Sequence, residues 1–119
     1  MTNEEVATAR EQTRQFGEHY DYDVTYMNEI LAASPRGFGH FTGVIEMSGL
    51  REVLPPEASF VAKIGAYTVI DCGPCLELSL KMGREAGVPD EILRAARDGG
   101  EELPAELARV RDYAAQIAA

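Results

Sequence analysis

The sequence predicts an all-α fold, and two observations lead to this prediction. Apolar residues recur at three- and four-residue spacing along most of the chain. Proline or glycine separates the resulting segments at lengths typical of helices, as at Ser34-Pro35, Leu54-Pro55-Pro56 and Gly99-Gly100. With 119 residues, 45% of them apolar, the chain is expected to form a single small domain with a modest core.

Residues 1–33 are expected to form an N-terminal helical arm. Segment 4–17 consists of good helix formers but has few apolar residues, of which Val6 and Phe16 are the main ones. A second helix is predicted after Asp23, because one apolar stripe follows, formed by Val24, Met27, Ile30 and Leu31.

Residues 34–119 are expected to form the helical core. Ser34 and Pro35 suit the cap and first turn of a third helix, whose inward residues would be Phe38, Phe41 and Ile45. Residues 57–71 are apolar on nearly all sides, which is typical of a buried central helix. A buried strand over residues 67–70 is the competing prediction, since short β-branched runs are ambiguous.

Three further helices are predicted in this core. The first begins at the cysteines, turns Leu76, Leu80 and Gly83 to one side, and ends at Gly87. A short helix follows over residues 90–97. The last begins at Pro104 and has apolar residues at helical spacing, including Leu107, Val110 and Ile117.

The chain has two cysteines, and they lie three residues apart in the segment Cys72-Gly73-Pro74-Cys75. A helix start stabilises a nearby thiolate through its unpaired N–H groups, and a second thiol at this spacing can capture the first as a disulfide. Pro74 is compatible with a first helical turn, where no N–H is needed. Cys72 and Cys75 are therefore the predicted redox pair, and two incidental thiols are the alternative.

Three other side chains are candidates for assisting the thiols. Ser79 lies one helical turn beyond Cys75, although its hydroxyl cannot act as a base near neutral pH. Glu57 and Tyr67 precede the cysteines, and either one can reach them if the two helices pack antiparallel. His40 is expected at the surface.

Composition excludes several classes of function. The net charge is −9, which disfavours nucleic acid and anionic lipid as partners. The acidic N-terminus and the lack of a long apolar run predict neither a leader nor a membrane span, so we expect a cytoplasmic protein. One Cys-x-x-Cys with two distant histidines fits no zinc spacing, and no glycine-rich phosphate loop is present, so neither metal nor cofactor is expected.

Two resemblances follow from these residues. Cys72-Gly73-Pro74-Cys75 resembles the thioredoxin active site, but residues 76–119 lack the strands of that fold. A longer stretch, about residues 34–98, resembles the alkylhydroperoxidase D and carboxymuconolactone decarboxylase superfamily. The resemblance lies in the order of apolar helix, proline break, apolar helix, Cys-x-x-Cys, and a helix ending at Ala86-Gly87-Val88 before acidic residues.

This resemblance implies an all-helical protein that assembles into trimers or hexamers. It implies a dithiol that reduces a peroxide or exchanges with a partner dithiol without a bound cofactor, with Cys75 attacking and Cys72 resolving. The chain departs from the family pattern at two positions. Ser79 stands where redox members have histidine, and Phe60 stands where they have glutamate.

We therefore expect a thiol–disulfide oxidoreductase that resembles alkylhydroperoxidase D, with weak peroxide reduction and a dithiol or thioredoxin-type reductant. The alternative is a non-enzymatic helical oligomer that keeps the cysteines as a structural or regulatory pair. The two hypotheses differ in whether Cys72 and Cys75 turn over a substrate.

Overall fold

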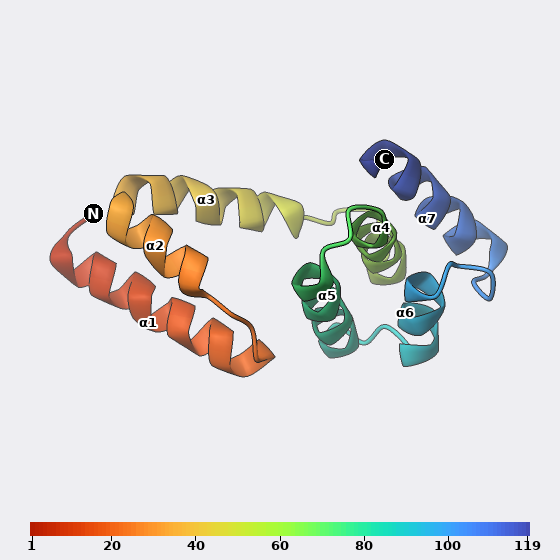
Figure 1. Ribbon diagram of the computed structural model, residues 1–119, viewed down its shortest axis with the longest axis horizontal. Helices are drawn as coiled ribbons and strands as arrows, with labels where there is room; N and C mark the ends of the chain where they lie inside the picture. The colour runs from red at the N-terminus through yellow and green to blue at the C-terminus, as the bar shows by residue number, and fades with distance from the viewer. The chain divides into compact units, whose positions relative to one another are not determined.

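The computed structural model describes all of residues 1–119 and is entirely helical, with seven α-helices and no strand (Figure 1). The prediction of an all-α fold is confirmed, and the competing strand at 67–70 is wrong because those residues continue the fourth helix to Val69. The helices are α1 (Asn3–Tyr20), α2 (Thr25–Ala33), α3 (Pro35–Ser48), α4 (Pro56–Val69), α5 (Gly73–Glu85), α6 (Asp90–Arg97) and α7 (Ala105–Ala118).

The chain divides into two compact units, Met1–Leu50 and Arg51–Ala119. From the sequence, we expected the boundary between the N-terminal arm and the helical core after residue 33, which would leave α3 with the C-terminal core. In the structure α3 belongs to the first unit, because Phe38 is buried in one cluster with residues of α1 and α2. This cluster consists of Ala9, Met27, Leu31 and Phe38.

The first unit begins with a well-capped helix. The Thr2 hydroxyl accepts a hydrogen bond from the Glu5 N–H, and the Glu5 carboxylate accepts one from the Thr2 N–H. This capping box satisfies two of the donors that a helix start leaves unpaired. Ser34 caps α3 as predicted, accepting a hydrogen bond from the Gly37 N–H.

The end of α3 differs from the prediction. Ile45 was expected to face inward, yet it is 44% exposed, and Val44, Met47 and Leu50 are more exposed still. The reason is one of length, since α2 has nine residues and α3 has fourteen. At 1.5 Å per residue α2 cannot cover the last turns of α3.

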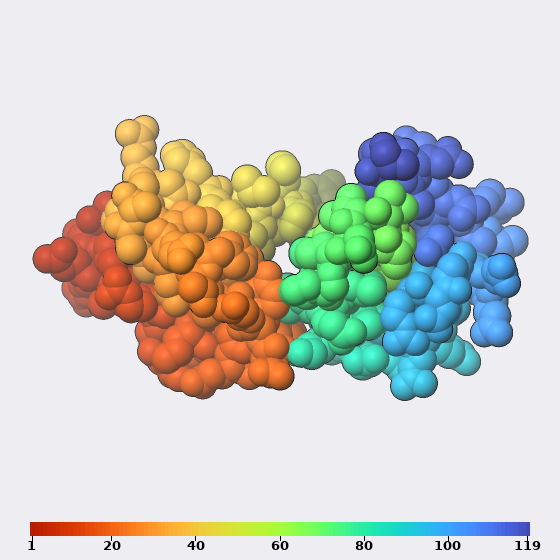
Figure 2. Space-filling model, in the orientation of Figure 1, coloured from red at the N-terminus to blue at the C-terminus, as the bar shows by residue number.

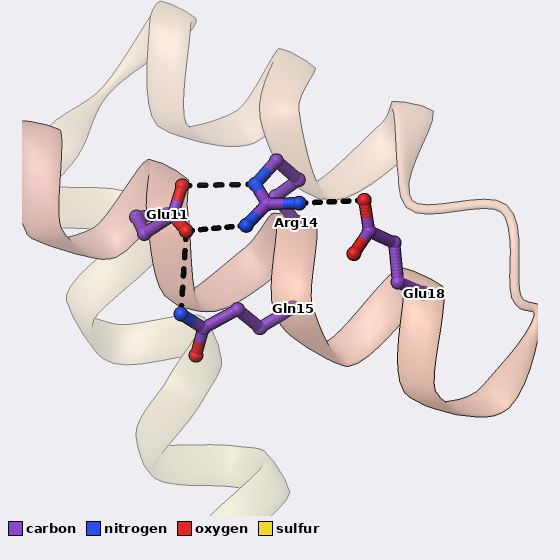
Figure 3. A network of polar contacts seen from close by, with 4 residues as sticks. All are labelled: Glu11, Arg14, Gln15 and Glu18. Atoms are coloured by element: carbon purple, nitrogen blue, oxygen red, sulfur yellow. Dashed lines mark hydrogen bonds and ion pairs between the residues drawn. The ribbon is translucent and has the colours of Figure 1, made fainter.

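An exposed ionic network lies on α1 (Figure 3). The Arg14 guanidinium donates two hydrogen bonds to Glu11, one of them 2.9 Å long, and a third to Glu18, while the Gln15 amide donates to Glu11 at 3.2 Å. The hydrogen bonds from Arg14 lower the pKa of Glu11 from 4.5 to about 2. The network stabilises α1 only while Glu11 is ionised.

This network predicts a pH dependence with a definite sign. Because the pKa of Glu11 is lower in the folded state, its contribution to stability is fully present above pH 4.5 and is lost as the pH falls through about 2. An NMR titration of the Glu11 carboxyl carbon should give a midpoint near 2, and Arg14→Gln should move it back toward 4.5. A midpoint near 4.5 in the unsubstituted protein would contradict the network.

The second unit packs α5, α6 and α7 against α4. Its core consists of Phe60, Val61, Ile64, Leu80, Val88, Leu93, Ala96 and Leu103. Side chains fill the spaces between the ribbons of α4, α5 and α6 (Figure 2). The helix α4 is therefore the central element of this unit, although Val69 and Ile70 at its end are exposed rather than buried as predicted.

Two glycines in this unit allow close helix packing. A Cβ atom at Gly83 would lie 2.7 Å from the Leu93 Cδ2 atom, and one at Gly65 would lie 3.0 Å from the Arg111 carbonyl oxygen. Both distances are shorter than van der Waals contact, so a larger residue would have to displace the Leu93 side chain at Gly83 or the Arg111 backbone at Gly65. This packing holds α5, and with it Cys75, in place.

Candidate functional site

The two cysteines lie at the junction between α4 and α5. Cys72 is the N-cap residue of α5, and Cys75 lies in the first turn of that helix. Their sulfur atoms form a disulfide, with the two Cα atoms 5.3 Å apart. Both cysteines are partly exposed, so the disulfide is accessible to a reductant.

The backbone before the cysteines is fixed by the way α4 ends. The Cys72 N–H donates a hydrogen bond to the Tyr67 carbonyl oxygen at 3.2 Å, a bond that spans the last turn of α4. The residue between them that makes this turn is Asp71, which adopts the left-handed conformation with φ 55°. This is the hydrogen bond of a Schellman motif, and it sets the position of Cys72 at the start of α5.

The same turn shows how the candidate Tyr67 contacts Cys72. Tyr67 contacts Cys72 through its main-chain carbonyl, and no hydrogen bond joins its phenol to either sulfur atom. The sequence offered no glycine to signal a left-handed turn at Asp71. Aspartate tolerates this conformation better than most residues, and that tolerance is the only local signal for the turn.

The turn gives a stability prediction. Asp71→Gly should raise the free energy of unfolding by about 1 kcal/mol, because glycine adopts a positive φ without the Cβ contact that penalises other residues. Urea denaturation measures the change. The matched control Asp98→Gly replaces a helix-capping aspartate at φ −92°, where no such gain is expected. A loss of stability in Asp71→Gly would show that the Asp71 side chain itself supports the turn.

The first turn of α5 favours a thiolate. The first helical hydrogen bond of α5 runs from the Leu76 N–H to the Cys72 carbonyl oxygen, at 3.0 Å. The N–H groups of Gly73 and Cys75, which precede Leu76, therefore have no helical partner. Pro74 has no N–H to satisfy. No acidic residue lies in this first turn, so the positive end of the helix dipole remains available to a sulfur anion.

The other candidates do not form a proton relay around the sulfur atoms. Ser79 lies one turn beyond Cys75 on α5, as predicted, and is only 6% exposed. No hydrogen bond joins Ser79 or Glu57 to a cysteine. Glu57 lies in the first turn of α4, at the end of the helix remote in sequence from the Cys72 turn, and His40 is exposed in the first unit.

Phe60, which departs from the glutamate that the resemblance implied, is part of the core. The residue is 4% exposed, with the Lys63 ammonium 5.2 Å and the Arg51 guanidinium carbon 5.8 Å from the centroid of its ring. Partial burial and, secondarily, the charge of Arg51 lower the pKa of Lys63. Both charged side chains that contact the Phe60 ring are therefore cationic.

Two further features bear on the class of site. Nowhere do three or more His, Cys, Asp or Glu side chains gather in a way that would hold a metal ion. None of the seven helices combines the length and the apolar character that crossing a membrane requires.

Comparison with protein-family models, with curated proteins and with solved structures found no match to this chain.

Proposed function

We propose that the chain is a thiol–disulfide oxidoreductase whose Cys72/Cys75 pair alternates between dithiol and disulfide. The observation that supports this proposal is the disulfide itself, formed between the N-cap and the first turn of α5 and partly exposed. A structural cross-link over three residues would close too short a loop to stabilise the fold much, because the entropy gained rises with loop length.

The reaction begins with the dithiol form. One thiolate attacks a sulfur atom of a substrate disulfide, forms a mixed disulfide and displaces one substrate thiolate, which takes up a proton. The second cysteine then attacks the mixed disulfide and displaces the other substrate thiolate. The protein is left oxidised, and a dithiol or thioredoxin-type reductant returns two electrons and two protons. In the assignment that the family resemblance implies, Cys75 attacks and Cys72 resolves.

A hydroperoxide is the second proposed substrate, and it should react slowly. The attacking thiolate takes the distal oxygen as a sulfenic acid and releases an alcohol, and the second thiol closes the disulfide with loss of water. The leaving alkoxide needs a proton, and general acid catalysis is worth about 10²–10⁴ in rate. Ser79 and Phe60 replace the histidine and glutamate of redox family members, so this assistance is missing.

The proposed assembly is a homo-oligomer, a trimer or hexamer in the family arrangement. Exposed apolar residues of the second unit support it, namely Val69 and Ile70 beside the cysteines and Tyr113 and Ile117 on α7. The proposed compartment is the cytoplasm, where a reversible dithiol is more useful than a permanent cross-link.

A coupled assay tests the proposed function. The protein is mixed with excess dithiol reductant and either a small aliphatic disulfide or cumene hydroperoxide, and consumption of each is followed. We expect faster turnover of the disulfide than of the peroxide. The control is the double variant Cys72→Ser/Cys75→Ser, and equal rates for the two proteins would overturn the proposal.

The same assay separates the alternative function, a non-enzymatic helical oligomer with a regulatory or structural cysteine pair. The lack of an acid or base hydrogen-bonded to the sulfur atoms favours this alternative. It predicts that neither substrate is turned over faster than by the double variant, whether or not the disulfide can be reduced.

A further inference from the structure

The first unit contains an apolar groove that the proposed redox function does not use. The groove has a volume of about 710 Å³ and is lined by residues of all three helices of this unit. Its floor contains Ala9, Met27 and Phe38, which are at most 7% exposed, and Phe16 and Ile45 extend the apolar lining. Methionine and aromatic floors of this kind adapt to an apolar side chain.

The two long sides of the groove are helices. Lining residues recur along α1 from Glu4 to Phe16, a distance of about 18 Å at 1.5 Å per residue. On α3 they recur from Phe38 to Glu46, about 12 Å. A further helix of similar length, lying between α1 and α3, would complete a four-helix arrangement. With nine residues, α2 is too short to cover this length of the groove.

The backbone of the groove walls indicates whether a helix or an extended peptide would bind in the groove. An extended peptide gains affinity by adding main-chain hydrogen bonds to a sheet edge. The walls here are helices, whose backbone groups are already bonded within each helix, and the chain has no strand. Side-chain contacts must therefore supply the affinity, as they do when an amphipathic helix lies in a groove.

The charge of the lining specifies the partner further. The three charged side chains that line the groove are all glutamates, Glu4, Glu5 and Glu46, and the polar remainder is neutral. Glu5 already accepts a hydrogen bond from the Thr2 N–H, whereas no ion pair engages Glu4 or Glu46. An apolar face flanked by lysine or arginine would be attracted here, and an anionic membrane would be repelled.

We propose that this groove binds an amphipathic helix of a partner protein whose apolar face is flanked by basic residues. Its apolar side chains cover Phe16, Met27 and Ile45, and its basic side chains pair with Glu4 and Glu46. The interaction is independent of the cysteines and does not require the redox function.

Two synthetic peptides test the proposal on the full-length chain. Each has 14 residues, a fluorescent label and leucine at helical positions i, i+3, i+4, i+7 and i+11, with flanking lysines in one peptide and flanking glutamates in the other. We expect saturable binding of the lysine peptide and about tenfold weaker binding, or none, of the glutamate peptide. Methyl NMR should show shifts at Ala9 and Met27 but not at Val53 in the second unit.

Matched variants show whether the groove is the binding site. Ile45→Gln should weaken binding by about tenfold, whereas Met47→Gln, on the same helix but outside the groove, should not. The double variant Glu4→Lys/Glu46→Lys should likewise lose binding, while Glu29→Lys/Glu52→Lys makes the same change of net charge elsewhere. Circular dichroism confirms that each variant is folded.

Three outcomes would overturn the proposal. The first is equal affinity of the chain for the two peptides. The second is an equal loss of binding in the groove variants and the control variants, because it would indicate a general attraction of the peptide to an acidic protein. The third is self-association of the unsubstituted chain that Ile45→Gln abolishes, because it would place a second copy of the chain in the groove.

Discussion

Replacing Cys75 alone with serine is expected to reduce disulfide turnover to the level of the cysteine-free double variant. Cys75→Ser removes the attacking thiol, and the remaining thiol of Cys72 cannot close an intramolecular disulfide, so the dithiol cycle cannot be completed. The assay follows oxidation of the dithiol reductant in the presence of a small disulfide. Turnover at the unsubstituted rate by Cys75→Ser would exclude a dithiol mechanism.

The reciprocal variant distinguishes the roles of the two cysteines. If Cys75 attacks, Cys72→Ser retains the attacking thiol and should accumulate a mixed disulfide with the substrate, visible by mass spectrometry. Ser79→Ala is the matched control, since it changes a neighbouring residue of α5 and keeps both thiols. Accumulation of the mixed disulfide in Cys75→Ser instead would reverse the assignment that the family resemblance implies.

The largest expected effect on stability is that of Leu93→Ala. Leu93 is 0% exposed, and its Cδ2 atom is 2.7 Å from where a Cβ atom at Gly83 would lie, so its side chain packs in the contact between α5 and α6. Removing it should leave a cavity and lower the free energy of unfolding of the second unit by about 2–5 kcal/mol.

Chemical denaturation followed by circular dichroism measures this loss. The matched control Leu54→Ala removes the same atoms from a leucine that is 49% exposed, and it should change the free energy of unfolding by less than about 0.5 kcal/mol. Similar losses in the two variants would contradict the core assignment. Because α6 holds α5, Leu93→Ala should also slow disulfide exchange before unfolding is complete.

Helix positions followed closely from the sequence, because each helix has its own local signals. Ser34 caps α3 as predicted, and Gly87 adopts φ 89° just after α5, the conformation that a helix-ending glycine provides. The stripe of Leu76, Leu80 and Gly83 faces the core as its spacing predicted, with Leu80 1% exposed. These features depend on residues within a few positions of one another, so they can be predicted directly from the sequence.

Features that depend on helix lengths and on contacts between residues distant in sequence could not be predicted from the sequence. Ile45 has the correct spacing for a core residue, but α2 ends too early to cover it. Val69 and Ile70 continue the apolar run of α4, yet they are 42% and 55% exposed. Spacing identifies the apolar side of a helix but not whether another helix covers it.

The candidate site was predicted in part. The cysteine pair and its place at a helix start followed from the sequence. The hydrogen bond from Cys72 to the Tyr67 carbonyl did not, because it depends on a left-handed aspartate with no glycine to mark it. The sequence proposed the phenol of Tyr67 as a candidate, whereas its backbone is the part that contacts Cys72.

The reduction potential of the Cys72–Cys75 pair tests the central proposal most directly. It is measured by equilibrating the protein with dithiol buffers of known potential and counting free thiols by alkylation and mass spectrometry. A reversible dithiol should lie between about −120 and −270 mV, the range of exchange-active pairs. A potential below about −300 mV, typical of structural disulfides, would contradict the proposal that this pair turns over a substrate.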